Sequence, residues 1–416
     1  MYRPGVVDVD GATIAWVGPA TEAPACKGPE RQLGGVLLPG LVNVHCHSPM
    51  TLFRGAAEDI PLDRFLREVL WPREARLTSE DVYWGMTLAC AELLRAGVTT
   101  TCEMYVEEDA LLAAVLDAGS RCTITPGVID APGWERLGGW RKRLDDVLGF
   151  CDRHQGAHQT IEVGIAAHSA YALPLEALVA ISDAARERDA LVHVHIAETR
   201  DECLALEQEH GMSVPVLLAD RGVLDARVLA AHSVWLSEAD LGIYREHDVA
   251  VAHCPQSNAK LAAGIAPLTE MLALGLRVGL GTDGPSSNND LDLWDELRLA
   301  PLLARVRTGD ASAVPAGQAL ALATRGGAGA LGLRGVGVLC AGGAADLVRL
   351  RFDDPSVVPV LADRDILSHL VWSASSRLVT DVWVAGRAVV TGGACMTVDV
   401  ERARREVQER AARLAT

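Results

Sequence analysis

Residues 39–55 have the sequence PGLVNVHCHSPMTLFRG, in which a short apolar run ends in two histidines that are one residue apart. The run at 41–47 predicts a buried β-strand. Side chains two positions apart on a strand lie on the same side, so His45 and His47 face one way while Cys46 faces the other. The stretch therefore predicts a strand that delivers two imidazoles to one place at its C-terminal end.

Similar apolar runs recur along the chain and alternate with longer helical segments. The eight expected strands cover residues 41–47, 98–103, 122–127, 161–168, 191–197, 228–232, 249–253 and 276–283. The helical segments between them include 79–96, 175–189 and 267–274. Alternation of this kind favours parallel strands, and eight units favour a closed barrel. The predicted fold class is α/β, with a (β/α)8 TIM barrel at its centre.

The two ends of the chain have a different pattern. Residues 6–40 and 335–393 contain short strands separated by turns, which is typical of antiparallel β-structure. We expect the two stretches to form one small β-sandwich, followed by an amphipathic helix over 399–414. The predicted division is a sandwich part at 1–40, a catalytic barrel at 41–334, and a second sandwich part with the closing helix at 335–416.

The composition limits the classes of protein that fit this sequence. The 416 residues carry a formal net charge of −17, which disfavours nucleic acid as a partner because phosphate backbones would repel the chain. No apolar run approaches the roughly 20 residues that a membrane span needs, and the first ten residues do not resemble a signal peptide. The ten cysteines form no Cys-x-x-Cys pair, which is typical of reduced thiols. We expect a cytoplasmic protein without a membrane partner.

Polar residues fall at the ends of the later strands as well. The strand-end residues are His168, His195, His232, His253 and Asp283, and Glu198 follows His195 by three positions. Active sites of (β/α)8 barrels are built at the C-terminal ends of the strands. These side chains are therefore expected to converge on one spot at the mouth of the barrel.

The residue types at these ends predict a metal site. His45, His47, His195 and Asp283 would supply three imidazoles and a carboxylate, a set that suits zinc and leaves a position for water. One histidine alone usually has a structural function. We assign such functions to His154, His158, His210, His247 and His369. His193 shares a face with His195 but lies about 6.6 Å deeper, so it is predicted to be a core residue.

Five stretches of the chain resemble a known family. They are PGLVNVHCHSPMTLFRG at 39–55, VHIAETRDE at 194–202, LAAHSVWL at 229–236, VAHCPQSNAKLAAGIAP at 251–267 and GLGTDGPSSNNDLDLWDELRLA at 279–300. They are similar to the amidohydrolase superfamily and, within it, to the 5'-methylthioadenosine/S-adenosylhomocysteine deaminases, whose relatives include guanine deaminases and triazine hydrolases. The resemblance covers nearly the whole chain and implies a barrel with a terminal sandwich.

The resemblance also implies a function for individual residues. It makes His45, His47, His195 and Asp283 the metal ligands, and it makes Glu198 and His232 the residues that move protons and orient the attacking water. Substrate-binding residues are expected at Glu74, which matches a carboxylate that grips ribose hydroxyls, and at His168, Phe65, Ser287 and Asn288. Binuclear members of the superfamily carry a bridging lysine at the end of strand 4. The nearest lysine here, Lys142, lies outside that strand, so a single divalent ion is expected, Zn²⁺ or Fe²⁺.

The expected reaction is hydrolytic deamination of a 6-aminopurine nucleoside such as adenosine, 5'-deoxyadenosine or 5'-methylthioadenosine. Members that accept the homocysteine tail carry an arginine where this chain has Pro126, and Arg136, Arg141 or Arg143 would have to replace it. Two alternatives remain open. One is a hydrolase of another heterocycle, such as guanine, a pterin or a triazine, and the other is a barrel that has lost catalysis. A homodimer or homotetramer is expected because exposed barrel helices often pair.

Overall fold

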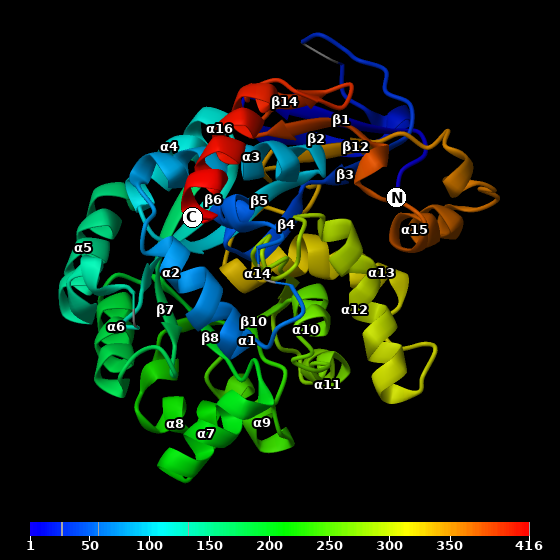
Figure 1. Cartoon of the computed structure of the whole chain (residues 1–416). Coiled ribbons are helices and arrows are strands. Elements are labelled where there is room, and N and C mark those ends of the chain that lie inside the picture. The colour runs from blue at the N-terminus through cyan, green and yellow to red at the C-terminus, as the bar shows by residue number, and fades with distance from the viewer. Residues whose placement is uncertain (26–27, 57, 132, 416) are drawn as a thin grey trace.

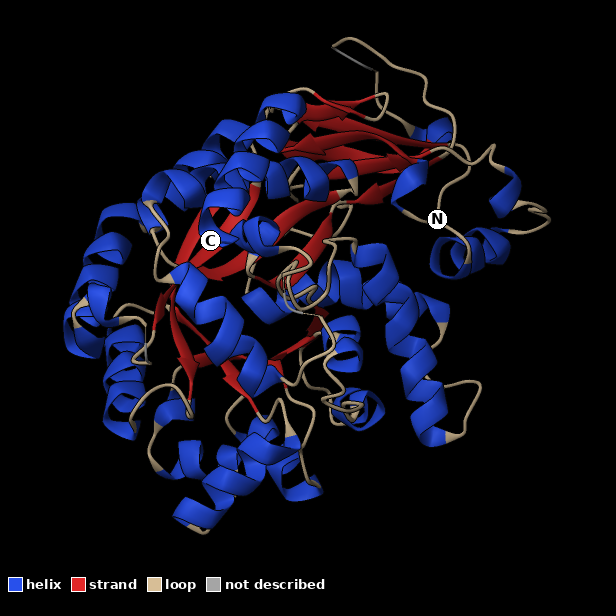
Figure 2. Cartoon of the chain, viewed as in Figure 1, coloured by secondary structure: helices blue, strands red, loops and turns tan. Residues whose placement is uncertain are grey.

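The computed structural model describes residues 1–25, 28–56, 58–131 and 133–415. Eight parallel strands lie side by side in chain order at its centre (Figure 2). They are β4 (Leu41–Cys46), β5 (Val98–Tyr105), β6 (Arg121–Val128), β7 (Ile161–Ser169), β8 (Leu191–Ile196), β9 (Arg227–His232), β10 (Ala250–His253) and β11 (Val278–Leu280). The backbone N–H of Asp283 donates to the His45 carbonyl at 3.0 Å, which joins the last strand to the first. The predicted (β/α)8 barrel is confirmed.

Helices surround the barrel and cover the outer side of its strands (Figure 1). The main ones are α3 (Ser79–Arg95), α4 (Glu108–Ala118), α5 (Gly139–His154), α6 (Leu175–Glu187), α7 (Arg200–His210), α8 (Val214–Asp220), α9 (Glu238–Glu246), α11 (Leu268–Ala273) and α12 (Leu293–Thr308). Three of them begin at a capping box, in which a Ser or Thr and an acidic residue three positions later bond each other's backbone N–H. The sequence therefore fixes where these helices begin.

The two ends of the chain come together on one side of the barrel (Figure 1). A two-stranded sheet contains β1 (Gly5–Asp10) and β2 (Thr13–Pro19). A five-stranded antiparallel sheet has the order β15 (Ala394–Cys395), β14 (Arg387–Thr391), β13 (Val379–Val384), β12 (Leu347–Leu350) and β3 (Val36–Pro39). Because β3 pairs with β12, neither end can complete this sheet alone, and the expected sandwich from both termini is present.

Two helices accompany the terminal sheets. The helix α15 (Asp363–Trp372) lies between β12 and β13 in the sequence and interrupts the expected run of short strands. The closing helix α16 (Val400–Ala415) is present as predicted and packs against α3. The Arg121 side chain on β6 donates to the buried carboxylate of Asp346 at 2.7 Å, which joins the barrel to the five-stranded sheet. No helix in the described part of the chain is long and apolar enough to span a bilayer.

Candidate metal centre

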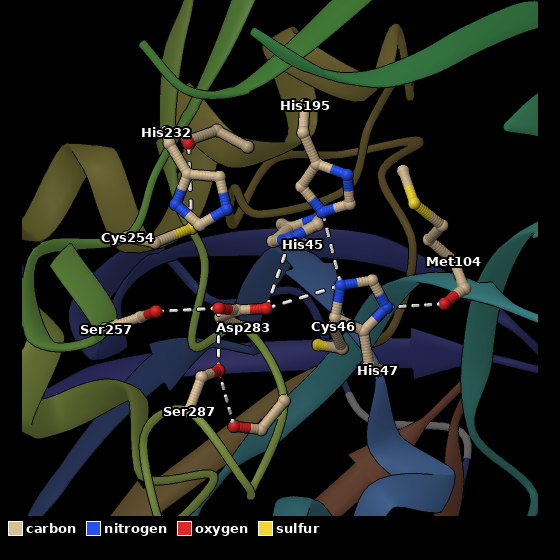
Figure 3. A network of polar contacts seen from close by, with 12 residues as sticks. His45, Cys46, His47, Met104, His195, His232, Cys254, Ser257, Asp283 and Ser287 are labelled. Carbon is tan, nitrogen blue, oxygen red and sulfur yellow. Dashed lines mark hydrogen bonds and ion pairs between the residues drawn. The ribbon is translucent and has the colours of Figure 1, made fainter. Parts of the chain in front are cut away.

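Four of the predicted side chains meet at the C-terminal ends of their strands (Figure 3). His45 lies on β4 and His47 directly after it, His195 lies on β8, and Asp283 follows β11. The Nε2 atoms of His45 and His47 each lie 3.3 Å from Oδ1 of Asp283. The Nε2 atoms of His47 and His195 are also 3.3 Å apart. All four residues are buried, so the group is shielded from bulk water.

The hydrogen bonds of His47 and His195 determine which ring nitrogen carries the proton. His47 Nδ1 lies 2.6 Å from the Met104 carbonyl, and His195 Nδ1 lies 2.7 Å from the His168 carbonyl. A carbonyl oxygen only accepts, so in both rings Nδ1 is the protonated donor and Nε2 has a free lone pair. The short contact between these two Nε2 atoms therefore contains no proton.

The carboxylate of Asp283 is held on one side only. Its Oδ2 accepts hydrogen bonds from the hydroxyls of Ser257 at 2.6 Å and Ser287 at 2.7 Å. These bonds leave Oδ1 turned toward the imidazoles. Asp283 has a φ of +60°, a left-handed conformation that an L-residue keeps only where its surroundings impose it. The backbone at the end of β11 is therefore bent so that this oxygen points at the histidines.

The arrangement fits a divalent cation. Ligands about 2.0–2.1 Å from a tetrahedral zinc ion lie roughly 3.4 Å from one another, and the three contacts here are 3.3 Å. In addition, Nε2 of His45 is buried and has no hydrogen-bond partner among the described residues. Unpartnered lone pairs and a carboxylate oxygen in one buried place repel one another unless a cation lies between them. The residues that could hold a metal ion form two groups, His45, His47 and His195, and His45, His232 and Asp283. Both contain His45, so they mark the same site.

Glu198 and His232 lie beside the four ligands. His232 Nδ1 is 2.9 Å from Oδ1 of Asn258, which makes Nδ1 the donor and leaves Nε2 facing Glu198 Oε1 at 3.8 Å. Burial, together with the negative charge of Asp283, raises the pKa of Glu198 to about 8. A carboxyl group with such a pKa keeps its proton at neutral pH, so Glu198 can act as an acid. The structure thus brings both predicted proton-transfer residues to the ligand cluster.

A pocket opens from the His47 side of the cluster. Its lining consists of His47, Trp71, Glu74, Met104, Tyr105, Val106, Gly127, Ile129, Trp134 and His168. Glu74 is buried and accepts a hydrogen bond from the Tyr105 hydroxyl at 2.9 Å, and burial raises the pKa of this carboxyl to about 7. The rings of Trp71 and His168 meet edge to face at 6.4 Å. Glu74 and His168, which are far apart in the sequence, therefore share one pocket with the candidate ligand His47.

Three residues that were predicted to contact substrate have other surroundings. Phe65 is buried in the core and is absent from the pocket lining, where Trp71 and Trp134 supply the aromatic rings. The Ser287 hydroxyl donates to Asp283. The Asn288 amide donates to the Thr282 carbonyl and to Glu296, both at 2.7 Å. The loop after β11 folds back on its own strand end, so Ser287 supports Asp283, and Asn288 joins this strand end to Glu296.

The sequence interpretation missed two buried residues at this site. His193, predicted to be a core residue, is buried but lies 2.8 Å from Nδ1 of His45 through its Nε2 atom. Glu103 accepts hydrogen bonds from the backbone N–H and the hydroxyl of Ser48, at 3.0 and 2.6 Å. Glu103 ends an expected strand, so the rule that selected the other residues would also have found it. His193 gave no comparable signal because it lies one strand repeat below the ends.

Comparison with known proteins agrees with this geometry. A model of the amidohydrolase family matches residues 36–389, and this range contains all four candidate ligands. The chain belongs to the amidohydrolase family. A 5-methylthioadenosine/S-adenosylhomocysteine deaminase of Pelotomaculum thermopropionicum is 41% identical over 418 residues, which cover 100% of this amidohydrolase and 95% of the relative.

Two further relatives of this amidohydrolase are also named as deaminases of adenosine compounds. A 5'-deoxyadenosine deaminase of Methanothermobacter thermautotrophicus is 40% identical, over 86% of this chain and 83% of the relative. The crystal structure of an adenosine deaminase from Xanthomonas campestris with bound zinc superimposes with a TM-score of 0.92 and 33% identity, over 98% and 93% of the two chains. The superposition on the Xanthomonas structure covers 98% of this chain, so that structure contains both the barrel and the terminal sheets.

Replacing one ligand of this amidohydrolase tests the metal site. His195→Ala removes one of the lone pairs, and we expect the purified variant to retain less than about a tenth of the metal bound by the unaltered protein. Elemental analysis by mass spectrometry measures the metal content. His210→Ala, at the end of the peripheral helix α7, is the control and should bind metal normally. A His195→Ala variant with full metal content would refute the assignment.

Proposed function

We propose that this amidohydrolase removes the 6-amino group of an adenine nucleoside by hydrolysis, with one zinc ion, and releases ammonia and the inosine analogue. The observation that carries the proposal is the position of Glu198, a buried acid that lies beside His232 at the ligand cluster. Attack at the amino-bearing carbon needs a proton donor at the neighbouring ring nitrogen, and a carboxyl group that is protonated at neutral pH supplies that proton. The three relatives described above, all named as deaminases of adenosine compounds, support the same reaction.

Asp283, His232 and Glu198 divide the proton transfers. When bound by His45, His47, His195 and Asp283, zinc supplies a nucleophile by lowering the pKa of water from about 16 to about 7. The Asp283 carboxylate accepts the proton of the attacking water, and the Ser257 and Ser287 hydroxyls hold that carboxylate in place through Oδ2. His232, held through Nδ1 by Asn258, directs Nε2 toward the reacting centre and orients the water.

Glu198 acts on the purine. It donates its proton to the ring nitrogen next to the amino-bearing carbon, which makes that carbon more electrophilic. The water oxygen then forms a bond to the carbon, and the carbon–nitrogen bond to the amine breaks. The proton taken up by Asp283 goes to the amine, which leaves as ammonia. The second proton of the water passes from the new hydroxyl to Glu198, which restores the acid and leaves the keto product. Water and the amino compound thus give ammonia and the keto product.

The remaining pocket residues fit a sugar. The Glu74 carboxyl accepts hydrogen bonds, and vicinal ribose hydroxyls are donors at a suitable spacing for a carboxylate. His168 and Trp71 lie against the same space with their rings edge to face. We infer that Glu74 binds the ribose hydroxyls and that the two rings hold the sugar.

The arginines near the pocket favour an uncharged substituent on the sugar. Arg143 is buried and bonds Glu108 through both terminal nitrogens, at 2.9 and 2.8 Å. Arg141 is exposed and pairs with Glu176, and Arg136 pairs with Glu107 at 2.9 Å. None of them lines the pocket, and neither does any other Lys or Arg of the described residues. Adenosine, 5'-deoxyadenosine and methylthioadenosine therefore fit better than a nucleoside with a homocysteine tail.

The pH dependence of the reaction tests the function of Glu198. Burial raises the pKa of this carboxyl to about 8, so the proton donor is present below that pH and is lost above it. We expect kcat/KM to fall about tenfold per pH unit above pH 8. Glu198→Gln, which has no proton to transfer, should lower kcat/KM by about 100- to 10,000-fold and abolish this alkaline decline. If the activity of Glu198→Gln still declines above pH 8, the decline belongs to another titrating group.

Glu74→Gln separates the nucleoside hypothesis from the hypothesis of another heterocycle. Loss of a charge-assisted hydrogen bond should lower kcat/KM for adenosine by about 10- to 100-fold. The assay is ammonia release from adenosine, 5'-deoxyadenosine, methylthioadenosine, S-adenosylhomocysteine, guanine and a pterin. 2'-Deoxyadenosine is the matched control, because it lacks one of the two hydroxyls and should be less sensitive to the substitution. If the protein prefers guanine or the pterin, and Glu74→Gln does not change its activity on that substrate, the result would favour the hypothesis of another heterocycle.

A further inference from the structure

We propose that His193 and Thr125 are positioning residues for the metal ligand His45. The three side chains form a chain of hydrogen bonds across the barrel interior, which places the His45 proton on Nδ1 and leaves Nε2 free for a divalent cation. The inference rests on the metal-dependent function proposed above. Both residues lie below the candidate ligands in the barrel interior.

This series of hydrogen bonds begins at the backbone of β5 and ends at His45 on β4. The Thr125 hydroxyl donates to the Glu103 carbonyl at 2.9 Å. His193 Nδ1 lies 3.0 Å from the same hydroxyl oxygen, and its Nε2 lies 2.8 Å from His45 Nδ1. All four residues are buried, with exposed fractions of 0% for each, so bulk water does not compete for these bonds.

The hydrogen bonds from His45 through His193 and Thr125 to the Glu103 carbonyl can all form in only one direction of proton donation. A hydroxyl has a single proton, and Thr125 gives it to the Glu103 carbonyl, so Thr125 can only accept from His193. His193 therefore carries its proton on Nδ1, and its Nε2 is an acceptor. The 2.8 Å contact then requires His45 to donate through Nδ1, which leaves His45 Nε2 unprotonated. This is the nitrogen that is buried without a partner at the ligand cluster.

The contact also limits how the His45 ring can rotate. The rings of His45 and His193 meet nearly perpendicular, with centroids 4.8 Å apart and an interplanar angle of 82°. The Cys102 sulfur lies 3.5 Å from His193 Nδ1, on the side where Thr125 is bound. His193 is thus held at both nitrogens, and it fixes the ring plane of His45 as well as its tautomer. Histidine ligands commonly depend on such outer contacts, and their loss lowers metal affinity.

The end of β5 orients both ligands of β4. The Glu103 carbonyl ends the chain that sets His45, and the Met104 carbonyl accepts from Nδ1 of His47. The Glu103 side chain also holds Ser48, the residue after His47, through two hydrogen bonds. The strand beside β4 therefore acts as a template for both imidazoles. If the side chain at position 193 only filled space, the Glu103 carbonyl would have no hydrogen-bonded connection to His45, and β5 would orient His47 alone.

Two substitutions at position 193 separate a hydrogen bond from simple packing. His193→Gln retains an acceptor oxygen within reach of His45 Nδ1, whereas His193→Leu fills similar space without an acceptor. Zinc affinity is measured on the purified full chain by competition with a chromophoric chelator. We expect Leu to lower the affinity by about 10- to 100-fold and Gln by less than about 3-fold. Thr125→Val, which removes the hydroxyl with little change of shape, should lower it by about 10-fold.

The visible spectrum of the cobalt-substituted protein is a second measurement that does not depend on activity. We expect a changed spectrum for His193→Leu and the unaltered spectrum for His193→Gln, since only Leu frees the His45 ring. Circular dichroism shows whether His193→Leu is folded. If it is unfolded, His193→Gln and Thr125→Val still test the proposal, because a normal zinc affinity in Thr125→Val contradicts the proposed series of hydrogen bonds. Equal losses in Leu and Gln would also contradict it and indicate packing alone. An unaltered protein that binds no zinc, or releases no ammonia from any purine, would instead refute the proposed function.

Discussion

The structure depends on one electrostatic constraint, which is the gathering of three imidazole lone pairs and a carboxylate oxygen in a buried place. The contacts of 3.3 Å among His47, His195 and Asp283 contain no proton that could be shared, because backbone carbonyls hold the imidazole protons on the far side of each ring. Such a group is unstable by itself and stable around a divalent cation. Metal binding and the local fold are therefore coupled, and each ligand needs its own supporting contact.

The barrel supplies these supports from neighbouring strands. The Asp283 N–H that joins β11 to β4 also places the carboxylate beside His45, so the hydrogen bond that closes the barrel also positions part of the site. Left-handed backbone conformations at Ala197, His232, Ser233 and Asp283 all occur where a strand ends at the cluster. Strain concentrated at the mouth is tolerated because the buried strands below it are well packed. The rigid part of the fold thus determines the geometry of the reactive part.

The sequence predicted the strand-borne parts of the site well because strand periodicity determines where a side chain points. All eight strands and the meeting of His45, His47, His195 and Asp283 follow from that rule and from the resemblance to the family. Loop residues obey no such period, which is why Ser287 and Asn288 were placed at the substrate although they support Asp283 and its loop. Phe65 begins the helical segment Phe65–Leu70 and is buried in the core, a position that the sequence pattern did not indicate. His193 was judged by its depth in the barrel, and depth does not reveal its hydrogen bond to His45.

X-ray absorption at the zinc edge of the purified protein tests the central claim most directly, because it reports the atoms bound to the ion. We expect three imidazole nitrogens and a carboxylate oxygen at about 2.0–2.2 Å from the zinc ion, with no sulfur. Cys46 and Cys254 lie close to the cluster (Figure 3), so a sulfur signal near 2.3 Å is a real alternative. A sulfur ligand, fewer than two imidazoles, or a protein without bound metal would contradict the account.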